Sequence, residues 1–233
     1  MIEHVSLALA TLAFIGSHLA MSHPLRTRLV QNLGEAGFAL LHSLIAFATL
    51  GWMIVAWRGI NAPVPMWIAP LWWWNVASAI MLLACILLVG SLFRNPAFPN
   101  AGARKPAMRP ATGVFAITRH PMNWSFILWA LVHISLWWSP RNLIVAMGIL
   151  ILAIAGSIGQ DRKKRALLGE GWRGWESRTS FIPFRALIDG RIPWRAAFPG
   201  WTALLGGLAL WLAITWFHAP MVSPIGGLGR GIG

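Results

Sequence analysis

The residues best suited to chemistry in this sequence are histidines and an arginine that lie in or beside apolar stretches. Arg119 and His120 precede Pro121, which opens an apolar stretch that continues through Trp129 to His133. Proline is well tolerated at the first position of a helix, and it forces the residue before it into an extended conformation. Because free N–H groups and the positive end of the helix dipole point out of a helix start, we expect Arg119 and His120 to form a site for an anionic or aromatic ligand.

A plainer interpretation of this segment stays open. In that interpretation Arg119 binds lipid headgroups and His120 only caps the helix. His133 favours the ligand site, because it lies four residues after Trp129 and therefore on the same helical face. It also lies within a segment that lipid should otherwise surround.

Imidazole is the ionisable group that recurs within the apolar stretches. His18 lies in the first stretch, His42 in the second, and His120 and His133 in or beside the fourth. A neutral imidazole enters an apolar interior without the cost of a charge, and it is a common haem ligand. The predicted helix interiors contain no acidic pair, and no Ser-His-Asp order or phosphate-binding loop stands out. Glycosidase, di-iron and nucleotide-hydrolysing chemistry are therefore not indicated.

Depth in the membrane leaves the choice of haem ligands open. The predicted helix directions place His18, His42 and His120 towards one side, whereas His133 lies about 18 Å along its helix. Two axial ligands of one iron must face each other at one level. The boundaries therefore favour a cluster of His18, His42 and His120. His133 joins it only if the Arg-His-Pro segment lies outside the bilayer and the first helix sits higher than these boundaries place it.

The composition indicates a polytopic membrane protein. Of the 233 residues, 57% are hydrophobic and 11% are charged, and the mean hydropathy is +0.64. The net charge of +13 falls in loops between apolar stretches, which favours contact with anionic lipid and makes nucleic-acid binding unexpected. The single cysteine, Cys85, lies inside an apolar stretch, so neither a disulfide framework nor a thiolate metal cluster is expected.

With about 20 apolar residues taken as one membrane span, the sequence predicts an all-α bundle of six transmembrane helices. We expect them at residues 4–22, 36–57, 67–92, 122–138, 140–160 and 200–218. Residues 1–222 are predicted to form a single transmembrane domain, and the Gly-rich residues 223–233 a flexible tail.

The loops have distinct predicted characters. Residues 93–121 are rich in Pro, Gly and Ala and are expected to pack as an irregular lid. Residues 161–199 are expected to extend the fifth helix and then to cover the bundle with a Gly/Trp segment. The loops after the first, third and fifth helices hold 16 of the 19 basic residues. By the positive-inside rule, these loops face the cytoplasm of a bacterial inner membrane and both termini lie outside.

Five segments together resemble the NnrU family over nearly the whole chain. They are Gly-Ser-His-Leu-Ala-Met-Ser-His (16–23), Arg-His-Pro-Met-Asn-Trp (119–124), Leu-Trp-Ala-Leu-Val-His (128–133), Asp161 with its basic run, and Ser-Phe-Ile-Pro-Phe (180–184). That family is named for denitrification. It is similar to the 15-cis-zeta-carotene isomerases, in which haem b performs a redox-dependent cis-to-trans isomerisation. The resemblance implies haem b, with His18 and His133 as its axial metal ligands. Ala130 stands where the isomerases have a cysteine proposed to exchange as a ligand, so that exchange is not expected here.

A second resemblance is more distant. Three segments are similar to parts of the isoprenylcysteine carboxyl methyltransferase superfamily: residues 113–122, which contain Arg-His-Pro, residues 169–176, and Phe-Ile-Pro-Phe (181–184). In that superfamily, Arg-His-Pro and a downstream acidic pair hold S-adenosylmethionine. In this chain Asp161 and a basic run stand where the acidic pair would be. The resemblance therefore implies a shared fold with an eroded S-adenosylmethionine site.

The leading hypothesis is a haem-b membrane protein that acts as a redox or isomerase-like factor on an isoprenoid or carotenoid. One alternative is an S-adenosylmethionine-dependent methyltransferase. The other is a non-enzymatic factor for a membrane nitrogen-oxide reductase, whose helices would contact the Gly206-Gly207 face. Beside the metal ligands, the residues expected to bind the cofactor are Arg119, His120, Trp129 and His42.

Overall fold

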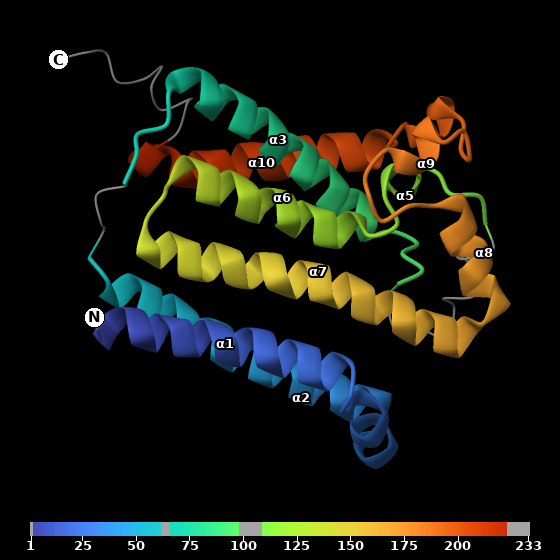
Figure 1. The fold of residues 1–233 in the computed structure, drawn as a ribbon, viewed down its shortest axis with the longest axis horizontal. Coiled ribbons are helices and arrows are strands. Elements are labelled where there is room, and N and C mark those ends of the chain that lie inside the picture. Colours follow the sequence, from blue (N-terminus) through green and yellow to red (C-terminus); the bar gives the residue numbers. More distant parts are fainter. Residues whose placement is uncertain (1, 62–65, 98–108, 223–233) are drawn as a thin grey trace. The chain divides into compact units, whose positions relative to one another are not determined.

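The computed structural model describes residues 2–61, 66–97 and 109–222, and every regular element in these ranges is helical (Figure 1). In chain order the elements are α1 (Ile2–Ser22), α2 (Arg26–Gly59), α3 (Leu71–Ser91), α5 (Val114–Ile117), α6 (Pro121–Leu136), α7 (Pro140–Leu168), α8 (Glu170–Arg178), α9 (Arg185–Ile188), the 3-10 helix η1 (Trp194–Ala197) and α10 (Trp201–Val222). The prediction of an all-α fold is confirmed.

Five of the described helices, α1, α2, α3, α7 and α10, are long and apolar enough to cross a membrane. The fourth predicted span corresponds to α6, which has 16 residues. It is therefore about 24 Å long, slightly less than the apolar thickness of a bilayer. Large apolar side chains such as Phe47 and Trp216 are 72% and 77% exposed on these helices, as expected where lipid replaces water. The chain is a polytopic helical membrane protein.

The chain divides into two compact units, each built from segments that are distant in sequence. Unit 1 comprises Met1–Ala69 and His133–Gly159, and unit 2 comprises Pro70–Val132 and Gln160–Gly233. Helices α6 and α7 each pass from one unit to the other. The single transmembrane domain over residues 1–222 stays a prediction, and the predicted tail at 223–233 lies outside the described residues.

In unit 1, α1 packs along α7 through two glycines. A Cβ atom on Gly148 would lie 2.4 Å from Cγ2 of Thr11, and one on Gly159 would lie 2.3 Å from the His23 ring. The missing side chains let the two helices approach closely. Because Thr11 meets Gly148 and His23 meets Gly159, α1 and α7 run parallel.

Helix α2 is interrupted at Gly34, whose φ of 70° and ψ of 172° lie outside the helical region. That conformation is essentially restricted to glycine. The predicted span began at residue 36, directly after the interruption. The additional helical segment before Gly34 is polar, with Arg26, Arg28 and Gln31, and its hydropathy therefore gave no signal of a span.

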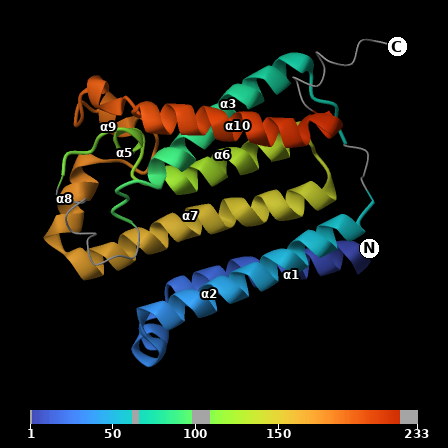
Figure 2. The same ribbon diagram turned by 180° about the vertical axis from the view of Figure 1, so that it is seen from behind.

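In unit 2, α3 and α10 lie side by side (Figure 2). A Cβ atom on Gly207 would lie 2.7 Å from Cα of Ile86, and one on Gly206 would lie 2.9 Å from Cγ1 of Val89. The Gly206-Gly207 face that was expected to contact a partner helix therefore packs against α3 of the same unit. Its small residues serve close packing within the chain.

The short elements α5, α8, α9 and η1 gather where α6 of unit 2 begins (Figure 1). Their shared core includes Phe115 of α5 and Trp172 and Trp175 of α8. As predicted, the helix of the fifth span extends beyond the span, to Leu168, and the Gly/Trp segment forms α8. The irregular lid predicted over residues 93–121 needs correction, because it contains α5, whose four residues are all buried. The lid residues 98–108 lie outside the described ranges.

Candidate functional site

Arg119 and His120 both bind the carboxylate of Asp161 in unit 2. Arg119 Nε donates to Oδ1 and Oδ2 at 3.2 Å, and its Nη2 donates to Oδ2 at 2.9 Å. His120 Nε2 lies 2.9 Å from Oδ1. The side chains of Arg119, His120 and Asp161 are 10%, 1% and 12% exposed. The positive charge that was expected to face an anionic ligand is therefore bound by a carboxylate of the chain itself.

Glu176 and Thr179 complete this buried cluster. Glu176 Oε1 lies 3.9 Å from Nη2 of Arg119, and its carboxylate accepts two hydrogen bonds from Arg165 at 2.7 and 2.8 Å. Thr179 Oγ1 accepts from Arg119 Nη1 at 3.5 Å and donates to the Trp175 carbonyl at 2.6 Å. Arg119 and Arg165 balance the formal charges of Asp161 and Glu176, which reduces the cost of burying the Arg119–Asp161 pair; the Arg165 side chain itself is 52% exposed.

Two of the segments singled out in the sequence meet at this cluster. The backbone N–H of Arg119 donates to Ser180 O at 2.7 Å. Thr118 Oγ1 and Trp124 Nε1 each donate to Phe181 O at 2.7 Å. The Arg-His-Pro segment is thus hydrogen-bonded to Ser-Phe-Ile-Pro-Phe, which holds the start of α6 in place. Helix α6 begins at Pro121 as predicted, with His120 O accepting its first hydrogen bond, from Trp124 N.

Asp161, Glu176 and Thr179 were not predicted from the sequence as members of the site. The fifth span was expected to end at residue 160, one residue before Asp161, so its interior was described as free of acid. The available signal was that Asp161 is the first acidic residue after a long apolar stretch, placed beside the basic run 162–165. Helix α7 continues to Leu168, which carries Asp161 to Arg119.

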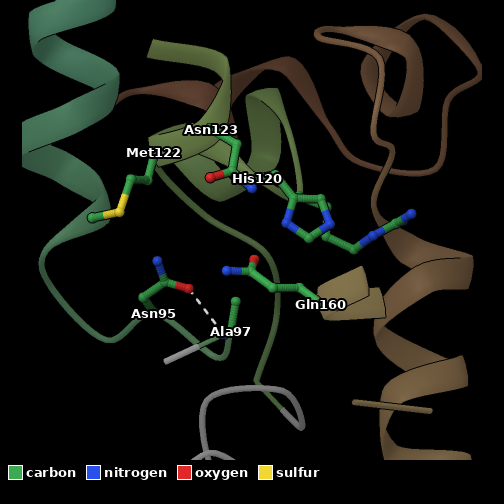
Figure 3. A pocket seen from close by; sticks show the side chains of 7 residues that line it. Asn95, Ala97, His120, Met122, Asn123 and Gln160 are labelled. Carbon is green, nitrogen blue, oxygen red and sulfur yellow. Dashed lines mark hydrogen bonds between the residues drawn. The ribbon is translucent and has the colours of Figure 1, made fainter. Parts of the chain in front are cut away.

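A small pocket lies against His120 in unit 2 (Figure 3). It has room for a group about the size of one water molecule, which is far smaller than S-adenosylmethionine. One wall is held by Asn95, whose Nδ2 donates to Ser91 O at 3.1 Å and whose Oδ1 accepts from Ala97 N at 2.9 Å. The lining residues are Asn95, Ala97, Arg119, His120, Met122, Asn123 and Gln160.

Two other predicted residues, His18 and His42, meet in unit 1. Their ring centroids are 5.1 Å apart and nearly perpendicular, so the rings are in edge contact with no space for a macrocycle between them. His18 Nδ1 lies 2.9 Å from Phe14 O. A carbonyl only accepts, so Nδ1 carries the proton and the neutral ring keeps its lone pair on Nε2. Phe14 and Phe38 pack beside these imidazoles at 4.3 and 5.8 Å.

His133 lies at another level of unit 1. Its carbonyl oxygen accepts a hydrogen bond from Asn142 Nδ2 at 2.7 Å, at the first turn of α7. In sequence, His18 lies between Thr11, which is beside Gly148, and His23, which is beside Gly159. Gly148 is six residues after Asn142 on α7, so the level of His18 is more than about 9 Å further along α7 than Asn142. The structure does not bring His133 into contact with His18, and their pairing on one iron stays a prediction.

The six predicted residues therefore fall into three groups. Arg119 and His120 share a carboxylate in unit 2, and His18 shares an aromatic cluster with His42 in unit 1. Trp129 is half-buried and lies one turn before His133 on α6, as the spacing predicted.

Comparisons with known proteins identify relatives of the chain. The NnrU family model, described as NnrU protein, matches residues 6–224. The chloroplastic 15-cis-zeta-carotene isomerase of Zea mays is 36% identical over 81 residues, which are 34% of this chain and 22% of that protein. The Arabidopsis thaliana protein of the same name is 36% identical over 95 residues, 39% of this chain and 25% of its own length. The matches thus cover at most a quarter of these relatives. No solved structure matches the chain.

Proposed function

The chain belongs to the NnrU family, and we propose that it is an isomerase-like membrane protein acting on a long apolar polyene or related isoprenoid. The observation that carries the proposal is its 36% identity to segments of two proteins named as 15-cis-zeta-carotene isomerases. A polyene of that kind dissolves in the apolar part of a membrane, where the spans of this chain would meet it. A cis-to-trans change also leaves the composition of the substrate unchanged, so the site needs no second substrate.

We further propose haem b as the cofactor, with His18 as the residue that holds it. The donor chemistry of His18 fits this role, because its Nδ1–H is bound by Phe14 O. Metal-binding histidines commonly use the second nitrogen in this way, which leaves Nε2 for the iron. When bound, haem b would supply a redox-active iron centre. The second ligand implied by the family resemblance is His133, because the edge contact of His18 with His42 leaves no space for haem between those two rings.

Absorption spectra of the purified protein, with and without dithionite, test the cofactor. We expect a Soret band that shifts on reduction and that His18→Ala abolishes. His218→Ala is the matched control, because His218 makes the same Nδ1 contact with a backbone carbonyl, at 2.9 Å, but lies exposed on α10. His133→Ala then tests the second ligand implied by the resemblance, and His42→Ala shows whether the ring packed against His18 affects haem binding. The absence of a Soret band after haem supplementation would contradict the haem proposal.

Expression in the dark in a bacterial host that accumulates 15-cis-zeta-carotene tests the reaction. Chromatography of the pigment extract should show loss of the 15-cis isomer in cells that express the chain. The His218→Ala control should convert the pigment like the unmodified chain, and His18→Ala should not. Unchanged isomer composition, despite protein in the membrane fraction, would count against the isomerase function.

Methyl transfer from S-adenosylmethionine is the second candidate. The contact between Arg-His-Pro and Ser-Phe-Ile-Pro-Phe favours it, because both segments belong to the methyltransferase-like pattern. The pocket beside His120 is small and Arg119 is bound to Asp161, so we rank this function below isomerisation. Calorimetric titration with S-adenosylhomocysteine separates the two candidates. Micromolar binding that Arg119→Ala abolishes would reverse the ranking.

A further inference from the structure

Trp194, Phe198 and Trp201 form an aromatic surface at the start of α10 in unit 2. These residues are 53% to 69% exposed, and the Phe198 and Trp201 rings pack edge to face with their centroids 5.7 Å apart. Trp201 is the first residue of a helix that is long and apolar enough to cross a membrane. Aromatic rings at the end of such a helix are typical of the boundary between lipid headgroups and acyl chains. The three rings therefore mark the level of this boundary on unit 2.

The backbone holds the segment between η1 and α10 in place. Ala196 O accepts a hydrogen bond from Gly113 N at 2.8 Å, which joins η1 to the residue that precedes α5. Gly200 has a φ of 85°, a conformation that favours glycine, and its carbonyl accepts from Leu204 N at 3.0 Å in the first turn of α10. The side chain of Arg195 therefore leaves the backbone at a fixed place beside the aromatic surface.

Arg195 brings an unbalanced positive charge to this surface. It directly follows Trp194, is exposed, and takes part in no salt bridge among the described residues. The four acidic residues of unit 2 already bind other cations; they are Asp161, Glu170, Glu176 and Asp189. The residues outside the described ranges include no aspartate or glutamate. The chain therefore supplies no acidic side chain to Arg195, and its charge is open to an anion from outside.

The aromatic surface indicates what carries that anion. A guanidinium binds a phosphate group through parallel hydrogen bonds, whereas exposed aromatic rings are stabilised by apolar neighbours. A phospholipid offers both, because its phosphate lies directly above its acyl chains. We propose that Arg195, Trp194, Phe198 and Trp201 form a binding site for an anionic phospholipid, with the phosphate on Arg195 and the upper acyl chains against the rings. This site goes beyond the proposed isomerase function and requires neither haem nor a polyene.

The test uses the full chain in mild detergent and a phosphatidylglycerol probe that carries a diazirine near the glycerol end of one acyl chain. We expect photolabelling within residues 194–201, located by mass spectrometry of the peptides. Unlabelled phosphatidylglycerol should compete about fivefold better than phosphatidylcholine, since one arginine near anionic lipid contributes about 1 kcal/mol. Glycerol 3-phosphate, which has no acyl chains, should not compete, and this separates a lipid from a free phosphate.

Two sets of variants separate the charge from the rings. Arg195→Gln should remove the preference for phosphatidylglycerol over phosphatidylcholine. Arg162→Gln is the matched control, because Arg162 is also exposed and without a salt bridge among the described residues, but charged residues flank it in sequence. It should change the preference less than about twofold. Trp194→Ala with Phe198→Ala should weaken both lipids to a similar extent and leave the preference unchanged.

Labelling confined to other parts of the chain would overturn the proposal, as would equal competition by the two lipids. Equal effects of Arg195→Gln and Arg162→Gln would also contradict it, because that result means attraction by diffuse charge. Labelling in detergent that is absent in the membranes of the expression host would assign the surface to a partner protein instead. The lipid comparison uses the unmodified chain and so does not depend on whether a variant folds. Because the assay contains neither haem nor polyene, its outcome is separate from that of the proposed function.

Discussion

Replacing Asp161 by leucine should destabilise the protein strongly. The change removes the acceptor of three Arg119 hydrogen bonds and of the His120 Nε2–H. The Arg119 guanidinium, whose side chain is 10% exposed, keeps only Thr179 at 3.5 Å and Glu176 at 3.9 Å. Loss of one partner from a buried ion pair costs about 3–5 kcal/mol. We expect the upper part of this range, because two donors lose their acceptor together. Arg119→Met should cost about 3 kcal/mol, since His120 still donates to Asp161.

The double variant shows whether Arg119 and Asp161 stabilise the protein together, as an ion pair, or independently, through packing. Arg119→Met with Asp161→Leu removes both charges and leaves His120 as the group that lost its partner. The loss of unfolding free energy in the double variant should be at least about 2 kcal/mol smaller than the sum of the losses in the two single variants. The measurement is unfolding in mixed micelles with added dodecyl sulfate, followed by tryptophan fluorescence.

Glu170→Gln is the matched control for this cycle. Glu170 pairs with Arg173 on α8, but its side chain is 82% exposed, so the change should cost less than about 1 kcal/mol. If the losses of stability in Arg119→Met and Asp161→Leu simply add in the double variant, the two residues do not act as an ion pair and the reasoning is refuted. An Asp161→Leu loss no larger than that of Glu170→Gln would also refute it.

Three further predictions concern helix packing, the junction of the two segments and membrane orientation. Gly207→Ala would place a Cβ atom 2.7 Å from Cα of Ile86 and should lower stability in the same unfolding assay by about 1–3 kcal/mol. Gly156→Ala, whose Cβ would meet nothing within 4 Å, should be neutral or stabilising by up to about 1 kcal/mol; equal effects would contradict the packing argument. Thr118→Val should cost about 1 kcal/mol, because Trp124 Nε1 still donates to Phe181 O. Adding Trp124→Phe should therefore cost more than the two single changes together, and an additive result would count against a shared acceptor. Alkaline phosphatase fused after Gly233 should be active and a green fluorescent protein fusion dark, as expected for a C-terminus outside the inner membrane; the opposite pair of results would reverse the orientation.

The membrane spans could be predicted from the sequence because the hydropathy of a span depends only on its own consecutive residues. Each predicted span has a matching helix in the structure, and Pro121 marks the start of α6 as its backbone chemistry requires. Hydropathy could not show that α2 extends through the interruption at Gly34 into a polar segment. It also could not show that the Gly206-Gly207 face is used within the chain, because that depends on which helix lies beside α10.

The candidate site was only half predictable. Arg119 and His120 stood out because a cation and an imidazole precede a helix-starting proline. Their partner Asp161 is 42 and 41 residues away in sequence, and its role depends on how far α7 extends and which side chain it presents. The meeting of His18 with His42 depends likewise on helix register, which composition and spacing do not determine.

Isomerisation by the purified chain tests the central claim most directly. The measurement is chromatographic separation of 15-cis-zeta-carotene from its 15-trans product, in the dark, in nanodiscs that hold the haem-supplemented and chemically reduced protein. We predict conversion that depends on the protein, that His18→Ala abolishes and that His218→Ala leaves unchanged. A preparation that binds haem, keeps its native tryptophan fluorescence and leaves the 15-cis isomer unconverted would contradict the proposed function.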